Sequence, residues 1–496
     1  MKILADVAQE QKGLQWLLLG AFGIGLLFDL MFYGQGLGIS YPLFVIGLYA
    51  LFIWQARQRI QLRFSRKQAF DWILSLPIFL LALTFFLFSN PHFHLFNLML
   101  IPFLFVIQTI LITKRHRAKW YEPGFFMEMM ETLLLYMPKY TRLPFRLTKD
   151  WIKSRLNSEK YGVMKKIFIG VGISVPLLVV VLSLLSNADS VFGHFLGQIP
   201  RRLIDIHSLE AIFRMFLIGI VTILVFAYMY SVFGKREETV VLPVPEDDKK
   251  IVWDGIILVT ILAIINIVYT AFTYIQISYL FSGVKRILPD GLTYAEYAKN
   301  GFNELVTVTV INFLILLCTM HFASRAKQML YRMIQVLLSM LTICTGFMLV
   351  SAYFRLSLYE DAYGYTHTRL LAHIFMIFLF VLFIIALFKI WRDGFSLIQY
   401  YAIVTLVSYV ILNYINMDVI IAKNNIQRYH SNGTIDIEYL SRLSYDAIPV
   451  VMELVQDKKV EETFMSMVQE RKEILYEDNS WQSFNLSEYR AKSYLP

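Results

Sequence analysis

The chain alternates between long apolar stretches and short polar ones, and the apolar stretches have the length of membrane-spanning helices. A helix rises about 1.5 Å per residue, so about 20 apolar residues cross the roughly 30 Å hydrocarbon core of a bilayer. Eleven stretches approach or exceed this length, and none has the alternation of a barrel strand. The predicted spans are 14–33, 38–56, 72–88, 93–112, 167–186, 212–233, 251–281, 302–323, 330–354, 370–390 and 396–416.

Composition agrees with this architecture, since 57% of the residues are hydrophobic, 17% are charged and the mean hydropathy is +0.55. These values exclude an ordinary soluble protein, so the expected fold class is all-α, a polytopic membrane bundle with a small helical C-terminal domain. Cys318 and Cys344 lie inside apolar stretches, where we expect small buried hydrophobes rather than a disulfide. No small-residue cleavage site follows the first stretch, which is therefore expected to remain as a helix.

Positive charge is distributed unequally between alternate loops. One set of loops carries 29 Lys and Arg and the other about 7, and loops rich in these residues stay on the cytoplasmic side. The N-terminus is therefore expected inside, and eleven crossings put the tail outside. The same rule explains the net charge of +9, so no nucleic-acid partner is expected. The basic set is the N-terminus with 57–67, 114–166, 235–250, 325–332 and 389–392; the outer loops include 187–211, 282–301 and 355–369.

Four regions are expected along the chain. The inside segment 113–166 is amphipathic and basic, which favours helices lying on anionic lipid, with a solvated loop as the alternative. In the tail, apolar spacing predicts helices at Ile435–Val455 and Val460–Tyr476, after a turn at Ser431–Gly433. The regions are 1–233 with the first six spans, a cytoplasmic linker at 234–250 with two prolines, 251–416 with five spans, and an extracytoplasmic helical tail at 417–496.

Polar residues gather at three outer helix ends. In the first cluster, Glu296 has capping-box spacing from Thr293, and Tyr297 and Glu304 share one helix face. Helix initiation explains much of this cluster, but a carboxylate such as Glu304 at the edge of hydrocarbon needs a partner. The second cluster runs from Arg355 to Arg369 and also holds Tyr359, Glu360, Asp361 and Tyr363. The third holds Asn413, Asn416 and Asp418.

Each cluster has a structural and a functional interpretation. Salt bridges between helices explain the second cluster, and capping and turn formation explain the third. We nevertheless expect the charges of 355–369 to pair with Glu304 and with the segment 413–418. Asp29 and Asp189 are weaker candidates near outer helix ends.

Three separated motifs carry a resemblance to a known family. They are Tyr294-Ala-Glu-Tyr-Ala-Lys-Asn-Gly-Phe302, Arg355-Leu-Ser-Leu-Tyr-Glu-Asp-Ala-Tyr-Gly364 and Gly433-Thr-Ile-Asp-Ile-Glu-Tyr-Leu-Ser-Arg-Leu-Ser-Tyr-Asp-Ala-Ile-Pro449. The chain resembles an uncharacterised bacterial family of polytopic membrane proteins known only as a domain of unknown function. The resemblance implies a multi-pass protein of the bacterial cytoplasmic membrane, and it brings no catalytic residue to transfer.

Other signals of chemistry are weak. The histidines, His367 and His373 among them, lack the spacing of a zinc site, and no phosphate-binding or nucleophile motif is present, so no cofactor or metal is expected. Within the spans, Asn266, Gln276 and Asn312 either line a path or form hydrogen bonds between helices.

These observations favour a scaffold, a sensor or a transporter-like envelope protein with a polar site on its outer face. Its candidate partners are an envelope protein or a lipid-linked ligand, besides the bilayer itself. The alternative is an intramembrane transferase that uses a lipid-linked donor at the outer leaflet, with Asp29, Asp189, Glu304 or Asp361 as its carboxylate. The first outer loop has no acidic pair, which counts against the alternative.

Overall fold

In the computed structural model, the regular secondary structure of the described residues is helical, apart from a single bridge between Trp253 and Ala323. Those residues are 2–59, 71–155, 206–234, 253–281, 294–323, 328–392, 394–454, 457–477 and 480–495, with isolated residues between 162 and 185. The predicted span 167–186 and the predicted linker 234–250 therefore lie almost wholly outside the described residues.

The chain divides into two compact units. The first unit comprises residues 1–86, 98–236 and 478–484, and the second comprises 87–97, 237–477 and 485–496. The predicted tail, 417–496, thus contributes most of its residues to the same unit as the helices from 255 onward.

The first unit is built from aromatic-rich helices. Tyr41 and Phe85 stack with ring centroids 4.2 Å apart, and the hydroxyl of Tyr49 donates to Gln108. Residues 482–484 lie against the start of α2, where Ile39 N donates to Phe484 O at 3.0 Å. A Cβ on Gly38 would overlap the backbone of Ser483, so this close approach requires glycine. The helices are α1 (Lys2–Phe32), α2 (Ser40–Arg59), α4 (Ser75–Leu87), most of α5 (Pro91–Ile112), α6 (Pro123–Glu131), the π-helix η1 (Thr132–Tyr136), α7 (Met137–Tyr140), α8 (Leu143–Arg155) and α11 (Ile206–Phe233).

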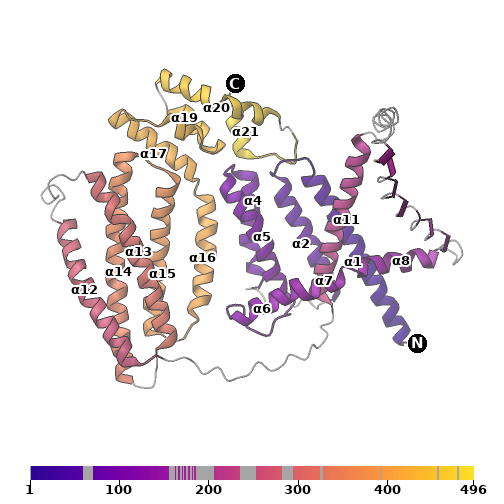
Figure 1. Ribbon diagram of the computed structural model, residues 1–496, viewed down its shortest axis with the longest axis horizontal. Helices are drawn as coiled ribbons and strands as arrows, with labels where there is room; N and C mark the ends of the chain where they lie inside the picture. The colour runs from indigo at the N-terminus through magenta and orange to yellow at the C-terminus, as the bar shows by residue number, and fades with distance from the viewer. Residues whose placement is uncertain are drawn as a thin grey trace. The chain divides into compact units, whose positions relative to one another are not determined.

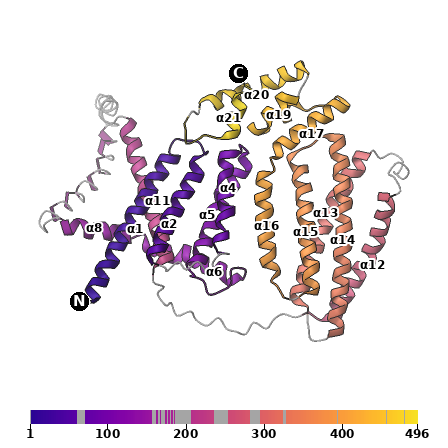
Figure 2. The same ribbon diagram turned by 180° about the vertical axis from the view of Figure 1, so that it is seen from behind.

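The second unit has long helices packed side by side, with shorter helices across their ends (Figure 1). Its long helices bury an apolar core that includes Leu341, Ala352 and Phe383, and the shorter ones bury a second core around Ile421, Phe464 and Leu495. The view from behind shows α13, α14 and α15 running alongside one another (Figure 2). The helices are α12 (Gly255–Phe281), α13 (Tyr294–Phe322), α14 (Gln328–Tyr363), α15 (His367–Trp391), α16 (Leu397–Tyr414), α17 (Met417–Asn432), α18 (Ile437–Ser441), the 3-10 helix η3 (Tyr445–Ala447), α19 (Ile448–Leu454), α20 (Lys458–Glu477) and α21 (Leu486–Lys492).

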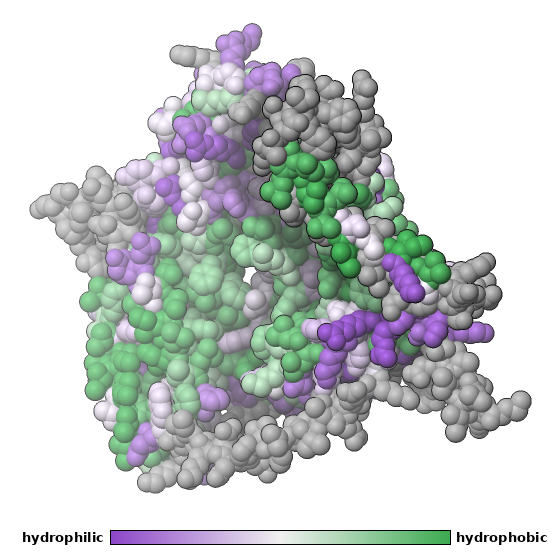
Figure 3. Space-filling view, turned by 45° about the vertical axis from the view of Figure 1, so that its right-hand side comes forward, coloured by the Kyte–Doolittle hydropathy of each residue, from purple (hydrophilic) through white to green (hydrophobic). Residues whose placement is uncertain are grey.

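Eight of the described helices are long and apolar enough to cross a membrane, namely α1, α5 and α11 to α16. A shorter apolar helix covers Asp71–Leu87, and α2 occupies the predicted span 38–56. Hydrophobic side chains cover the sides of the long helices on the face shown in Figure 3. Length and apolarity together make this a multi-pass membrane protein, as the apolar pattern predicted.

The tail differs from its prediction in one respect and agrees in another. The single helix predicted at Ile435–Val455 is instead α18, η3 and α19, because Ser444 is extended and Pro449 cannot continue a preceding helix. Helix α20 confirms the second predicted helix. Helix α17 was not predicted; Asn416 caps its start and Gly433, with φ +71°, ends it.

Candidate functional site

Asp418, a buried carboxylate of the tail, lies in the first turn of α17. Its residue is only 1% exposed, although a carboxylate is costly to bury without partners. Asn416, two residues earlier, caps the helix, because its side-chain oxygen accepts a hydrogen bond from Val419 N. The sequence therefore starts a helix at the point where it must also bury a charge.

Three donors from three distant segments meet at the Asp418 carboxylate. Asn90 Nδ2 lies 2.9 Å from Oδ2, Ser444 Oγ lies 2.7 Å from Oδ2, and His367 Nε2 lies 2.5 Å from Oδ1. Asn90 precedes α5, His367 begins α15 and Ser444 precedes η3. Asp418 thus joins the loop before α5, the membrane helix α15 and the tail within the second unit.

His367 continues this arrangement to Tyr439. The Tyr439 hydroxyl accepts a hydrogen bond from the backbone N–H of His367 at 2.9 Å and lies 3.0 Å from its Nδ1. A histidine that donates from Nε2 to Asp418 presents its Nδ1 to the tyrosine hydroxyl, so that both ring nitrogens have a partner. The result is an aligned tyrosine–histidine–aspartate chain.

A second carboxylate, Asp446, lies beside the first. It accepts from Ser89 N and Ser89 Oγ, both at 2.9 Å, and from Asn416 Nδ2 at 3.0 Å. Ser444 Oγ lies within hydrogen-bonding distance of both carboxylates, 2.7 Å from Asp418 and 3.1 Å from Asp446. We call Asn90, His367, Asp418, Tyr439, Ser444 and Asp446 the Asp418 network.

The electrostatics of the network follow from these contacts. Burial alone would raise the pKa of Asp418, but hydrogen bonds from His367, Ser444 and Asn90, with the attraction of His367, hold that pKa below its usual value. Burial raises the pKa of the Tyr439 phenol, which therefore keeps its proton.

The lowered pKa of Asp418 predicts a pH dependence of stability. Because the folded protein binds the Asp418 proton less readily than the unfolded chain, the stabilisation is complete above the unfolded pKa, about 4, and is lost as the pH falls through the folded value. The stability difference between wild type and Asp418→Asn should therefore shrink below about pH 4. Thermal unfolding in detergent from about pH 3 to 7 measures this. A constant difference over that range would contradict it.

Two asparagines extend the polar contacts along α5 and α16. Asn97 Nδ2 donates to Asn413 Oδ1 at 2.7 Å, and Tyr409 Oη donates to Asn97 Oδ1 at 2.8 Å. Asn97 and Asn413 are both buried. Asn413, Asn416 and Asp418, which the sequence grouped together, thus all bond to the segment 89–97 or to the tail.

The stretch 355–369 reaches Asp418 through His367 rather than through an arginine. The guanidinium of Arg369 donates to Gly364 O and lies 4.4 Å from the centroid of the Tyr359 ring, which packs on Tyr363. Asp361 is exposed and accepts a long hydrogen bond, 3.4 Å, from the Tyr365 hydroxyl.

Glu360 forms a separate buried pair with His373. Its Oε2 lies 2.9 Å from His373 Nε2, and the two residues are 3% and 6% exposed. Arg355 lies elsewhere, against Gly301 and 3.3 Å from Gln276 Oε1. Glu304 is exposed, and no salt bridge between described residues joins it to Arg355.

The remaining candidates are Asp29, Asp189, Glu296 and Tyr297. Asp29 belongs to the first unit, where Arg214 Nη2 lies 2.6 Å from its Oδ2. The side chains of Glu296 and Tyr297, and the whole of Asp189, lie outside the described residues.

Sequence reasoning missed Asn90, His367, Tyr439, Ser444 and Asp446. A signal existed for three of them, because Tyr439, Ser444 and Asp446 all lie in the tail motif that carries the family resemblance. His367 carried no such signal, because its partner, Asp418, is 51 residues away. Only the packing of α17 on the start of α15 brings the two together.

The comparisons with known proteins bear on this site. The family described as Domain of unknown function (DUF4153) matches residues 75–454. The chain belongs to this family. Every member of the Asp418 network lies within the DUF4153 match, and the predicted resemblance to a family of unknown function is confirmed. No curated protein and no solved structure matches the chain.

Proposed function

We propose that this DUF4153 chain is a membrane scaffold or sensor of the cell envelope, with its helical tail and its polar site on the extracytoplasmic face. The observation that carries the proposal is the Asp418 network. Its buried carboxylate binds the tail to the ends of the membrane helices. Asp418 already accepts three hydrogen bonds, so its chemistry is that of a fixed anchor. A firmly held tail gives an envelope partner or a lipid-linked ligand a rigid surface to bind.

The proposed topology has eleven crossings, an inside N-terminus and an outside tail, in a bacterial cytoplasmic membrane. The charge asymmetry of the loops supports this orientation. The proposed contact of segment 113–166 with anionic lipid is supported by exposed apolar side chains beside basic ones, such as Phe145 and Trp151 beside Arg146 and Lys149 on α8.

The alternative, a transferase using a lipid-linked donor, requires a carboxylate that is available for proton transfer or metal binding. Asp29 is paired with Arg214, and among the described residues neither Asp361 nor Glu304 belongs to a group of three or more side chains that could hold a metal ion. The geometry therefore favours the scaffold or sensor.

Cysteine labelling tests the orientation. In a background with Cys318→Ala and Cys344→Ala, cysteines at the exposed positions Asp361 and Thr434 should react with a membrane-impermeant maleimide in intact cells. A cysteine at the exposed Lys149 should react only after permeabilisation. The reverse pattern would contradict the proposed orientation, and labelling of all three sites in intact cells would do so as well.

A second experiment tests the role of the tail. A photo-crosslinking residue at Thr434 should give the same discrete adduct, with one envelope protein or one lipid, in the wild type and in Asp361→Asn. The adduct should be lost in Asp418→Ala, whose tail is no longer anchored. Equal yields in all three backgrounds would show that the anchored tail does not create the binding surface.

A further inference from the structure

The first turns of α12 and α14 line an open pocket of about 730 Å³. This volume lies within the range of about 300–1,000 Å³ that small-molecule pockets have. Both helices are long and apolar enough to cross a membrane, and their spans begin at Gly255 and at Gln328. The pocket therefore lies where two membrane helices begin, close to the level at which lipid headgroups meet lipid chains.

Apolar side chains form most of the wall of this pocket. On α14, Met329, Met333 and Val336 follow one another at spacings of four and three residues, which puts them on one helix face, and all three are exposed. On α12, Val259 and Ala263 are four residues apart and line the same pocket. Methionine side chains are flexible and fit apolar ligands of irregular shape. These walls therefore suit a hydrocarbon chain.

Arg332 gives the pocket a positive charge. It lines the pocket together with Gln328, and no acidic side chain is among the lining residues. Arg332 is exposed, and within the described part of the chain no hydrogen bond or salt bridge joins its side chain to another residue. The acid closest in sequence to the α12 wall, Asp254, accepts a hydrogen bond from Ile256 N at 2.7 Å. The pocket thus combines apolar walls with a guanidinium that has no acidic partner among the described residues.

A positive charge beside apolar walls matches an anionic amphiphile. The planar fork of an arginine binds phosphate oxygens, and the apolar walls accept an acyl chain. A soluble anion would leave the walls uncovered, and an uncharged lipid would leave the guanidinium without a counter-charge. The chemistry of the pocket therefore points to a phospholipid with a net negative charge.

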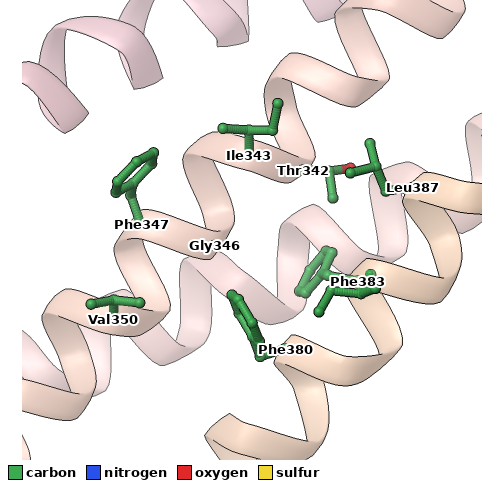
Figure 4. Close-up of a pocket in the computed structure, with 9 residues that line it drawn as sticks. Thr342, Ile343, Gly346, Phe347, Val350, Phe380, Phe383 and Leu387 are labelled. Atoms are coloured by element: carbon green, nitrogen blue, oxygen red, sulfur yellow. The ribbon is translucent and has the colours of Figure 1, made fainter.

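A second pocket on α14 has the same apolar character without the charge. There α14 and α15 enclose a pocket of about 290 Å³ around Gly346, and Phe380 and Phe383 line it (Figure 4). Its one polar side chain is that of Thr342, whose hydroxyl donates to Leu338 O. This second pocket suits the hydrocarbon chain of any lipid, because nothing in its lining selects a headgroup.

We propose that the pocket at Arg332 binds one anionic phospholipid, whose phosphate pairs with Arg332 and whose acyl chain lies along α12 and α14. In the proposed orientation this end of the helices faces the cytoplasm, and anionic lipids of that leaflet attract basic residues. The site belongs to the second unit, so it is separate from the lipid contact proposed for segment 113–166. The choice of leaflet rests on the proposed orientation, whereas the preference for an anionic lipid does not.

Photolabelling of the full chain in detergent tests the site. Two lipid probes carry the same photoreactive diazirine in an acyl chain, one on phosphatidylglycerol and one on phosphatidylcholine, and mass spectrometry maps the labelled peptides. The phosphatidylglycerol probe should label the pocket segments 259–263 and 328–337 about fivefold more than the phosphatidylcholine probe, which is the factor expected for one basic residue beside an anionic headgroup. Both probes should label the second pocket, at 342–350 and 380–387, alike.

Variants assign the preference to Arg332. Arg332→Gln should lower the phosphatidylglycerol labelling of the pocket segments to the phosphatidylcholine level, and Arg332→Lys should keep most of it, because lysine preserves the charge. Arg392→Gln is the matched control, since Arg392 is exposed, belongs to the same unit and does not line the pocket. Labelling of the pocket segments should be unchanged in this control.

The proposal is overturned if the two probes label the pocket segments equally, or if Arg332→Gln keeps the preference of the wild type. Loss of labelling in millimolar glycerol phosphate would also overturn it, because the site would then belong to a soluble phosphate. The acidic run 246–248 precedes α12 in the sequence and is the other candidate partner of Arg332. Replacing Glu246, Asp247 and Asp248 by their amides should leave the phosphatidylglycerol labelling unchanged, whereas a rise would show that this run occupies the site.

Discussion

Replacing Asp418 by alanine is expected to destabilise the second unit by about 3–5 kcal/mol, the range found when one partner of a buried charged contact is removed. The loss is large because three donors, from Asn90, Ser444 and His367, lose their acceptor in a buried site. Thermal unfolding in detergent should show the effect, and limited proteolysis should cut the tail of the variant faster than that of the wild type.

Two matched variants make this result specific. Asp418→Asn keeps one acceptor oxygen and should lie between wild type and alanine. Asp361→Ala removes an exposed carboxylate near the end of α14 and should change stability by less than about 0.5 kcal/mol. If Asp418→Ala were as stable as Asp361→Ala, the Asp418 network would not be the anchor of the tail.

The second large effect is expected in the first unit, at the pair of Asp29 and Arg214. Asp29→Ala should lower the unfolding temperature by on the order of 5 °C, because Arg214, in a membrane-spanning helix, loses the carboxylate that it binds through Nε and Nη2. Thermal unfolding of the purified chain measures this change.

The double variant Asp29→Leu/Arg214→Leu should recover most of the loss, since removing both charges leaves no unpaired group. Asp150→Ala, an exposed carboxylate on α8, is the control and should leave the unfolding temperature unchanged. A double variant less stable than Asp29→Ala would show that the pair contributes more than mutual neutralisation.

The contrast between the two sites guides how the family can be studied. Asp29, with Arg214, is a pair between two helices of one unit, whereas Asp418 joins three segments that are far apart in the sequence. Variants at Asp418 and Ser444 therefore test the tail, and variants at Asp29 and Arg214 test the helices of the first unit.

Much of the fold followed from the sequence because its signals are local. Apolar length predicted the membrane helices, since about 20 such residues are needed wherever the helix packs. Spacing of apolar residues predicted α20. The break between α18 and α19 was missed because apolar spacing continued through it, although Pro449 was a local sign of interruption.

The candidate site was predicted only in part. Asn413, Asn416 and Asp418 were singled out because polar residues at a helix end are visible in the sequence. Their partners were not, because His367, Asn90 and Ser444 meet Asp418 over separations of 51, 328 and 26 residues. Arg355 shows the same limit, since its charge suggested Glu304 and the fold places it beside Gln276 and Gly301.

The sequence by itself determined that this is an all-helical, multi-pass membrane protein with a helical tail, because hydrophobic length and periodicity are properties of each segment alone. Tertiary structure decided which polar residues act together. A buried carboxylate takes its partners from whatever packing brings within about 3 Å, and that distance is set by the fold rather than by position along the chain. Asp418 with His367 is the case in which this decided the proposed function.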